Sequence, residues 1–358
     1  MVKRIVKILL VVLAAILAAA VIYLAYVMLS YSRISDNQSL VPYNTAGKES
    51  VKTDTEYTIT TQNMGFGAYL PDFSFFMDGG TESWAKSKES VTGAINEGGK
   101  TVLGYKPDFA LFQEVDTDST RSHHVDQQKL LDKIYSEYSG VYAVNYHSAF
   151  LMYPLTKPHG ASNSGILTYS KYGIESSVRR SLPISTGFSK FLDLDRCYSV
   201  SRIKTESGKD LVIYNVHTSA YGGSEEIRKS QMTMLFNDIK SEYEKGNYCI
   251  CGGDFNHDFT GTSAKELNGD DAPIYGWSQP FPVQYLPDCI KQCTNYRDGL
   301  NPTCRDTGDV YKKDSYSVVL DGFLVTDNIE CTYVQNMDVS FAYSDHAPVV
   351  MKFKLKKQ

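Results

Sequence analysis

The sequence has no excess of positive charge and no dense cluster of Lys and Arg. Its 36 Lys and Arg residues are outnumbered by 41 Asp and Glu residues, and the formal net charge is -5 at pH 7. Proteins that bind nucleic acid along a broad basic surface have the opposite balance, because they must offset the phosphate charge. The composition therefore argues against such a surface, while leaving room for a few cations around one cleft.

The chain also lacks the cysteine pattern of a structural zinc site. None of its seven cysteines forms a Cys-x-x-Cys pair, the spacing on which many such sites are built. Cys289, Cys293 and Cys304 lie in a loop-rich region, where we expect one disulfide if this part of the chain lies outside the cell. Internal repeats and low-complexity tracts are absent too, which excludes repeat architectures.

An apolar, uncharged stretch covers residues 8–29 and follows Lys3, Arg4 and Lys7. About 20 apolar residues span a bilayer, and positive charges before the span favour a cytoplasmic N-terminus. We therefore expect a single-pass signal anchor in the cell membrane, with residues 1–7 cytoplasmic and the following domain extracytoplasmic. A signal peptide cleaved after the alanines at 18–20 is the alternative, but the chain stays apolar as far as Leu29.

Residues 30–53 are polar and contain several turn-forming residues, so we expect a juxtamembrane linker there. In the remaining segment, 54–358, short apolar runs typical of strands follow one another, often without an intervening helix. The clearest helix begins after Ser224, a good N-cap, and ends before Gly246. This pattern favours a domain with mixed sheets and helices on the outside.

Polar side chains recur where the predicted strands end. One such residue means little, but several on one rigid scaffold are what a preorganised site requires. Asp254 and Asn256 illustrate the geometry, because side chains two residues apart after a strand point the same way. The full set is Asn63, Glu114, His217, Asp254, Asn256, Asp321, Asp345 and His346.

Six short motifs containing these residues occur in a fixed order. They are Gln62-Asn63-Met64, Gln113-Glu114-Val115, Asn215-Val216-His217, Gly253-Asp254-Phe255-Asn256, Leu320-Asp321-Gly322-Phe323 and Ser344-Asp345-His346. The ordered set resembles the endonuclease/exonuclease/phosphatase superfamily, which includes pancreatic-type deoxyribonuclease, abasic-site endonucleases, neutral sphingomyelinases and inositol-polyphosphate 5-phosphatases. The resemblance covers about residues 56–355. It implies a catalytic domain over 54–358 with an α+β or α/β fold, a four-layer sandwich of two packed mixed β-sheets flanked by helices.

The resemblance also implies a divalent-metal-dependent hydrolase that acts on phosphoester bonds. A phosphoester is anionic, and nucleophilic attack builds further negative charge, which a hard cation with oxygen ligands offsets. We expect Mg²⁺, with Mn²⁺ as a substitute. Glu114 is the first ligand candidate, with Asn63 beside it and Asp345 assisting at the metal or the water.

Five residues are expected to carry the catalytic chemistry. As the resemblance implies, Asp254 orients or deprotonates the attacking water, and Asn256 holds the phosphate or that water. His217 and His346 donate hydrogen bonds to phosphate oxygens, most strongly as imidazolium. By family analogy, Asp321 pairs with His346, fixes its tautomer and raises its pKa.

Residues in the loops are candidates for substrate binding. Two of them have an ordinary alternative role. Arg121 could be a solvated surface side chain, and Arg196 could pair with Asp195. The set is Arg121, Asn163, Arg196, Thr303 and Arg305.

The sequence is compatible with three functions. The first is an anchored phosphodiesterase or phosphatase that acts on lipid head groups or other small phosphoesters. The second is an extracellular endonuclease for DNA or RNA, which the acidic composition disfavours. The third is a catalytically inactive binding module, for which the loss of Glu114, Asp254 or His346 would be the expected mark. The sequence indicates no protein partner.

Overall fold

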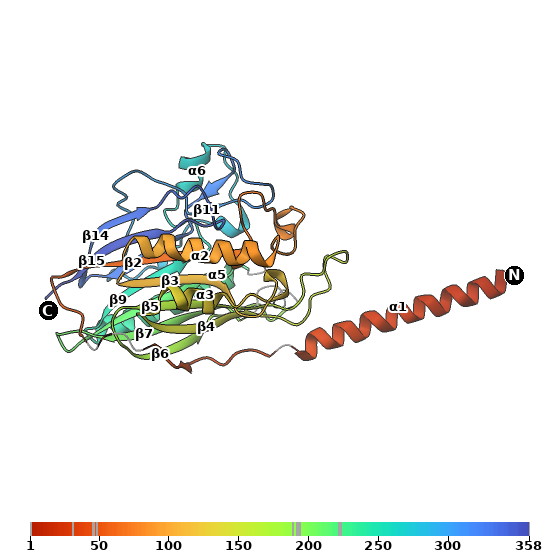
Figure 1. The fold of residues 1–358 in the computed structure, drawn as a ribbon, viewed down its shortest axis with the longest axis horizontal. Coiled ribbons are helices and arrows are strands. Elements are labelled where there is room, and N and C mark those ends of the chain that lie inside the picture. The colour runs from red at the N-terminus through yellow and green to blue at the C-terminus, as the bar shows by residue number, and fades with distance from the viewer. Residues whose placement is uncertain are drawn as a thin grey trace.

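The computed structural model describes residues 2–30, 32–44, 47, 49–187, 190, 195–220 and 224–357. Its N-terminal helix α1 (Val2–Ser30) projects away from the folded domain (Figure 1), and none of its residues is buried. The helix contains the whole apolar stretch expected from the sequence and is long and apolar enough to cross a membrane.

Two mixed β-sheets form the centre of the domain. The first sheet runs in the order β1 (Gln38–Leu40), β6 (Ile174–Ser181), β7 (Cys197–Lys204), β8 (Asp210–His217), β9 (Tyr248–Asp254), β13 (Asp321–Thr326) and β10 (Ile290–Gln292). The second runs in the order β14 (Ile329–Asn336), β15 (Val349–Leu355), β2 (Glu56–Asn63), β3 (Phe109–Asp116), β5 (Asn163–Ser170) and β4 (Ser139–His147). A separate two-stranded pair consists of β11 (Cys304–Arg305) and β12 (Ser317–Val318).

Helices cover the outer faces of both sheets (Figure 1). The second sheet carries α2 (Lys88–Gly104) and α3 (Gln127–Ile134), and the first carries α5 (Glu225–Glu244). The remaining elements are short: α6 (Ser263–Asn268) and the 3-10 turns η1 (Gly65–Gly67), η2 (Phe76–Asp78), η3 (Thr120–Ser122), η4 (Gly276–Ser278) and η5 (Val283–Tyr285). The expected four-layer sandwich is therefore confirmed.

Strand alternation explains how the layers pack. On β3, Leu111 packs between the sheets, whereas its neighbour Phe112 packs in the cluster that contains Val91 of α2. On β8, Ile213 faces the inter-sheet core, and Tyr214 packs with Leu235 of α5. Successive strand residues point to opposite faces, so strands buried on both faces are apolar almost throughout.

Each sheet contains one parallel pair whose strands are joined through a helix. β2 pairs in parallel with β3 and is connected to it through α2, and β8 pairs with β9 through α5. Parallel strands end at the same edge of a sheet, so the residues that follow these four strands come together. This edge is where the polar strand-end residues gather.

The segment expected to be a linker, residues 30–53, is attached to the domain. It contributes the edge strand β1, which pairs antiparallel with β6, and Val51 is fully buried in the inter-sheet core. Neither strand could be predicted from the sequence, because β1 has only three residues and β6 consists mainly of charged and hydroxyl side chains.

Candidate active site

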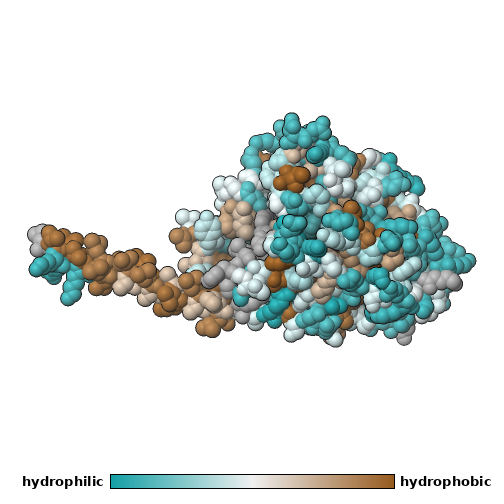
Figure 2. Space-filling model, turned by 180° about the vertical axis from the view of Figure 1, so that it is seen from behind, coloured by the Kyte–Doolittle hydropathy of each residue, from teal (hydrophilic) through white to brown (hydrophobic). Residues whose placement is uncertain are grey.

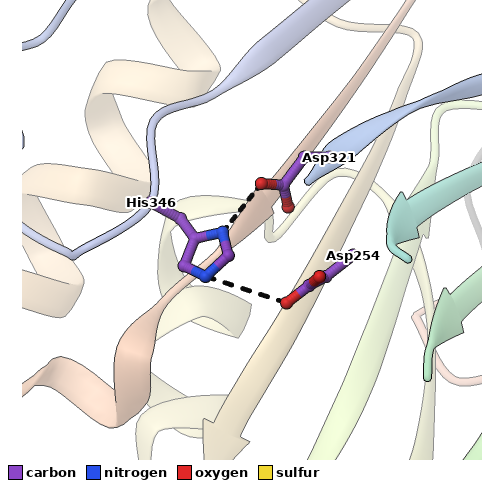
Figure 3. Close-up of side chains that lie close together, drawn as sticks. All are labelled: Asp254, Asp321 and His346. Carbon is purple, nitrogen blue, oxygen red and sulfur yellow. Dashed lines mark hydrogen bonds and ion pairs between the residues drawn. The ribbon is translucent and has the colours of Figure 1, made fainter. Parts of the chain in front are cut away.

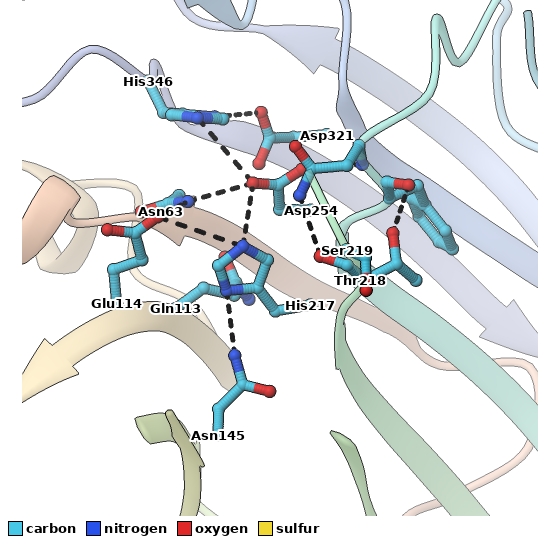
Figure 4. A network of polar contacts seen from close by, with 12 residues as sticks. Asn63, Gln113, Glu114, Asn145, His217, Thr218, Ser219, Asp254, Asp321 and His346 are labelled. Atoms are coloured by element: carbon cyan, nitrogen blue, oxygen red, sulfur yellow. Dashed lines mark hydrogen bonds and ion pairs between the residues drawn. The ribbon is translucent and has the colours of Figure 1, made fainter. Parts of the chain in front are cut away.

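The polar residues at the ends of β2, β8 and β9 meet at one point. His217 and Asp254 are direct partners in the parallel register of β8 and β9, and Asp321 is opposite Asp254 on β13. Asn63 ends β2 in the other sheet and still reaches Asp254. Figure 4 shows the side chains from both sheets converging, so the site is built where the two sheets share an edge.

Asn63 is fully buried and connects the two sheets. Its amide oxygen accepts the N–H of Gly65 at 2.9 Å, so its amide nitrogen faces the site. That nitrogen donates to Asp254 Oδ2 at 3.0 Å and to Glu114 Oε1 at 3.3 Å. To act as the metal ligand expected from the sequence, Asn63 would have to take its oxygen away from Gly65.

Glu114 occupies a distorted part of β3. The register with β5 shifts between Phe112 and Val115, and Glu114 has a φ of 52°. A left-handed backbone is uncommon for a residue with a β-carbon, and bulges of this kind often re-aim a side chain beside a functional site. The carboxylate lies 3.9 Å from His217 Nε2 and remains 26% exposed, so it is open to the cleft.

His217 is buried and electrically neutral. Burial lowers its pKa well below the ordinary value, and the nearby charges of Arg196, His346 and Arg121 lower it further. Asn145 Nδ2 lies 3.1 Å from His217 Nδ1, while Asn145 Oδ1 accepts the N–H of Cys197. Because this fixes the amide orientation, Nδ1 is the acceptor and we assign the proton to Nε2. Arg196 Nη1, 3.0 Å from Nε2, is then a close neighbour of the ring and not a hydrogen-bond donor to it. The hydrogen-bond donation expected of His217 would therefore come from a neutral ring and not from an imidazolium.

His346 has the opposite charge state. Its Nδ1 donates to Asp321 Oδ2 at 2.7 Å, and its Nε2 lies 3.7 Å from Asp254 Oδ2 (Figure 3). Burial alone lowers the pKa of His346, but Asp321, Cys304 and Asp254 together raise it well above the ordinary value. His346 is therefore a cation held between two carboxylates at neutral pH.

Asp254 is buried, and its carboxylate is surrounded by donors. The backbone N–H of Asn256 donates to Oδ1 at 2.9 Å, and His217 Nε2 lies 3.6 Å from Oδ2. Burial raises the pKa of Asp254 to about 6, an effect that His346 opposes and Asp321 reinforces. A carboxylate with a pKa close to neutral is suited to take a proton from water.

Asn256 is held in a strained conformation beside Asp254. Its φ is 45°, and its Nδ2 donates to the carbonyl of Thr218 at 3.0 Å. Its side chain lines the cleft together with Asp254, as expected for a residue that contacts phosphate or water.

Asp345 and Glu114 make the cleft strongly acidic. Burial and, to a smaller extent, the charge of Glu114 raise the pKa of Asp345 to about 7, although His346 opposes the shift. Together with Asp254 they place three carboxylates in the lining of the cleft, which also contains Asp78 and Asp306. A divalent cation is the natural counterion for such a group, because carboxylate oxygens are the ligands that Mg²⁺ prefers.

The residues present therefore fit a metal, in two places. Glu114 and Asp345 offer oxygens to the open cleft. Asp254, Asp321 and His346 also have donor atoms within 4.8 Å of one another, and Asp321 Oδ1 is buried without a hydrogen-bond partner. The first place is the better match, because Asp321 and His346 already bind each other.

The candidate substrate residues fall into different positions. Arg196 and Arg305 line the cleft, and Arg196 Nη1 lies 3.0 Å from His217 Nε2. Arg121 is held by two hydrogen bonds to Asp116 (2.9 and 3.1 Å) and stacks over the ring of Phe66. Arg121 lines an adjoining part of the cleft, where it is already paired.

Thr303 and Asn163 differ from the expectation of substrate contact. Thr303 is fully buried, and its hydroxyl accepts the backbone N–H groups of Leu320 and Asp321 at 2.8 and 3.0 Å. It therefore positions Asp321, which corrects the expected substrate contact. Asn163 begins β5 outside the cleft lining, whereas its neighbour Ser164 lies on it.

Three residues that support the site were not among the predicted site residues. Asn145 fixes the tautomer of His217. Below the site, Gln113 Nε2 donates to Asn215 Oδ1 at 2.7 Å, and Asn215 Nδ2 donates to the carbonyl of Leu167 at 3.0 Å. The amides of Gln113 and Asn215 interrupt apolar strands, and that interruption is the signal that could have revealed them.

The cysteine prediction is not supported. All seven cysteines are free thiols, so no disulfide joins Cys289, Cys293 and Cys304. Cys293 instead lies beside Cys331, with which its side chain interacts.

The sandwich and its strand-end site match a known class of fold. A family model described as the Endonuclease/Exonuclease/phosphatase family matches residues 61–346, a range that contains the site from Asn63 to His346. The chain belongs to this family, whose superfamily includes metal-dependent phosphoester hydrolases and nucleases. No curated protein matches the chain.

Solved structures show the same fold at low sequence identity. A family protein from Beutenbergia cavernae has 16% identity and a TM-score of 0.55, covering 84% of this chain and 72% of that chain. One from Bacteroides vulgatus has 16% identity and a TM-score of 0.53, with coverages of 85% and 100%. TDP2 from D. rerio, in complex with a single-strand DNA product, has 13% identity and a TM-score of 0.51, with coverages of 84% and 100%.

Proposed function

We propose that the chain is a membrane-anchored, divalent-metal-dependent phosphoester hydrolase. The observation that carries this proposal is the charge arrangement of the cleft. The carboxylates of Glu114, Asp254 and Asp345 line the cleft together with the cationic His346 and the neutral ring of His217. Such a site can bind a cation, hold an anionic phosphate and accept a proton within a few ångströms.

Each residue has a distinct part in the proposed mechanism. Asp254 takes a proton from the attacking water, whose oxygen bonds to phosphorus while the opposite P–O bond breaks. His346, kept charged by Asp321, and His217 donate hydrogen bonds to the phosphate oxygens as charge accumulates on them. Asn256 holds the phosphate or the water, and solvent reprotonates the departing oxygen.

The metal would be Mg²⁺ or Mn²⁺, held by Glu114 and Asp345, with Asn63 as a further ligand after rotation of its amide. When bound, it supplies a positive charge that neutralises the phosphate and lowers the cost of attack. Arg196 and Arg305 are the proposed substrate contacts, because both line the cleft.

The proposed location is the cell membrane, with α1 as a single-pass anchor. Lys3, Arg4 and Lys7 precede the apolar stretch, which favours a cytoplasmic N-terminus and an extracytoplasmic catalytic domain. An anchored cleft favours phosphoesters of lipid head groups or small molecules near the membrane.

An endonuclease is the second candidate. It is supported by the arginines and by Tyr69 and Trp277 in the cleft wall, since aromatic rings stack with exposed bases. A catalytically inactive binding module is the third, and the complete set of polar residues at the site argues against it.

A substrate panel tests the proposal. The full chain in detergent micelles with Mg²⁺ is given plasmid DNA, sphingomyelin, phosphoinositides and a soluble bis-aryl phosphodiester. Asp254→Ala is the blank. Metal-dependent turnover of a lipid or a small ester is expected, whereas cleavage of DNA alone would favour the endonuclease. Inactivity on all four substrates would favour the binding module.

A further inference from the structure

The loop between β4 and β5 exposes a row of large apolar side chains. Phe150, Met152, Tyr153 and Leu155 are 37%, 43%, 69% and 81% exposed. Single exposed apolar residues are common on soluble proteins, but several on one short loop indicate an interaction surface. We refer to residues 148–155 as the apolar loop.

The apolar loop contacts the end of α1. Tyr23 Oη donates to the carbonyl of Phe150 at 3.2 Å and accepts the N–H of Met152 at 2.8 Å. Tyr26 Oη accepts the N–H of Phe150 at 3.2 Å. In Figure 1 the loop that follows β4 projects from the domain toward α1, and Figure 2 shows hydrophobic side chains where the domain meets the helix.

These contacts fix the depth of the loop relative to a bilayer. An α-helix rises about 1.5 Å per residue, so Tyr23 and Tyr26 lie roughly 24 and 28 Å beyond Lys7. The hydrocarbon core of a bilayer is about 30 Å thick, and tyrosines concentrate at its borders. A span that starts after Lys7 therefore places both tyrosines, and the apolar loop bonded to them, at the outer membrane interface.

The connection between the helix and the first contact of the following chain with the domain is short. Four residues after Ser30, the N–H of Ile34 donates to Asp195 Oδ1 at 3.0 Å. Four extended residues span at most about 14 Å. Asp195 Oδ2 also lies 2.6 Å from Nδ1 of His147, the last residue of β4, so one buried carboxylate ties the linker to the base of the apolar loop.

We propose that the apolar loop inserts into the outer leaflet of the bilayer beside α1 and seats the domain on the lipid surface. The exposed Lys157 follows the apolar residues, where its ammonium would meet lipid phosphates. The occupant of this surface is the membrane that already holds the helix. The apolar loop has apolar side chains at its tip and a cation behind them, as segments that bind at a membrane interface do.

The seated loop brings the catalytic cleft to the membrane. Tyr153 packs on Phe76 with ring centroids 5.8 Å apart, and Phe76 packs on His159 at 5.7 Å. His159 lines the cleft together with Glu114 and His217. This inference rests on the proposed function, and it narrows the substrate class to phosphoesters carried by membrane lipids.

A depth measurement tests the insertion without any catalysis. The full chain carrying Leu155→Trp is reconstituted in vesicles whose acyl chains are brominated near the head group. Lys209→Trp is the matched control, because residue 209 is exposed in the β7–β8 turn at the opposite edge of the sheet. Trp84 and Trp277 give the same background in both variants and in the wild type, which is subtracted.

The indole at position 155 is expected to lose about half or more of its emission, since interfacial segments sit roughly 5–10 Å deep. The indole at 209 should lose little. Equal quenching in the two variants would overturn the proposal. A blue-shifted but unquenched indole at 155 would overturn it too, because a protein surface would then cover the loop.

A second experiment separates this inference from the proposed function. The double variant Tyr153→Asp, Leu155→Asp should lose most turnover of a vesicle-borne phosphoester while keeping turnover of a soluble bis-aryl phosphodiester. Equal losses on both substrates would contradict the seating role. If the wild type hydrolyses neither substrate, the proposed function fails, and the quenching result still decides whether the loop inserts.

Discussion

The two histidines of the cleft have the same chemistry and similar burial but opposite charge states. His346 lies between Asp321 and Asp254, and its pKa is raised well above the ordinary value. His217 lies against Arg196 and Asn145, and its pKa is lowered well below that value. Burial lowers the pKa of both rings, and their charged partners make the difference: carboxylates keep His346 a cation, whereas Arg196 lowers the pKa of His217 further.

The opposite charge states give the two histidines different roles in the site. A charged ring can stabilise the phosphate throughout the reaction, whereas a neutral ring can lie beside Arg196 and the carboxylates without adding to either charge. Two cationic histidines beside Arg196 would repel one another, and two neutral ones would leave less positive charge for the transition state.

The largest effect is expected from the group that lies between the two histidines. Asp254→Asn keeps the shape of the side chain but removes its ability to accept a proton, so turnover of a bis-aryl phosphodiester should fall by about 10³-fold or more. His346→Ala should have a similar effect. Steady-state rates measure the loss, with the exposed Asp271→Asn as the matched control. Near-wild-type turnover in Asp254→Asn would contradict the assignment.

Removal of divalent cations should abolish activity almost as completely. Glu114 repels Asp345, and Asp321 repels Asp254. A cation relieves this repulsion, so excess chelator should stop hydrolysis and added Mg²⁺ or Mn²⁺ should restore it. Isothermal calorimetry with Mg²⁺ gives a readout without substrate, and Glu114→Gln should weaken that binding. Full activity in excess chelator would exclude the metal mechanism.

Asp321→Asn should weaken the cationic state of His346. Without the Asp321 carboxylate, the pKa of His346 falls, and the ring loses its charge at a lower pH than in the wild type. Turnover should therefore fall by about 10²-fold at neutral pH, and the alkaline limb of the pH–rate profile should move to lower pH. Thr303→Val removes the hydroxyl that accepts the backbone N–H of Asp321. It should reduce turnover less than Asp321→Asn and leave the alkaline limb of the pH–rate profile in place.

Arg196→Gln should make the neutral state of His217 less favourable. Loss of the guanidinium removes one cause of the low pKa of His217, so that pKa should rise, although burial keeps it below the ordinary value. We expect a loss of about 10-fold in kcat/KM, because a substrate contact is also removed. NMR titration of His217 measures the shift, with the exposed Arg297→Gln as control. An unchanged titration would contradict the role assigned to Arg196.

The smallest effect on catalysis is expected at Glu242, on α5 and outside the cleft. Burial raises the pKa of Glu242, but hydrogen bonds from Arg202, Lys245 and Asn247 lower it to about 2. The ionised form therefore stabilises the fold above the ordinary pKa near 4.5, and this contribution is lost as the pH falls toward 2. Glu242→Gln should reduce the free energy of unfolding by about 1–2 kcal/mol at pH 7 and by less near pH 2.

Urea unfolding of the full chain in detergent measures the change at Glu242. Glu244→Gln is the matched control, because Glu244 on the same helix is 59% exposed and pairs only with Lys240 among the described contacts. A pH-independent difference between the Glu242 variant and the wild type would contradict the linkage. Neither variant should shift the titration of the two histidines.

The parts of the site that follow strands could be predicted from the sequence. Asp254 and Asn256 follow an apolar run, and the direction of strand side chains brings them to one edge. The layered fold could be predicted for the same reason, since apolar runs such as that around Leu211 to Val216 are buried on both faces. Both signals are local, so they can be read from the sequence without knowledge of the tertiary structure.

The rest depends on contacts that no local pattern contains. Asn145 lies in a strand with ordinary neighbours, and only the packing of β4 against β7 brings it to His217. The pairing of Arg121 with Asp116 and the burial of Thr303 likewise arise from tertiary packing. The neutral state of His217 could not be predicted, because it is set by burial and by Arg196, which approaches from a neighbouring strand end.

The central claim is that this cleft hydrolyses phosphoesters with Asp254 as the proton acceptor. The most direct measurement is hydrolysis of a soluble bis-aryl phosphodiester by the full chain in detergent with Mg²⁺, beside Asp254→Asn prepared in the same way. The account predicts metal-dependent release of the aryl alcohol by the wild type and almost none by the variant. Equal rates in the two proteins, with or without Mg²⁺, would contradict it.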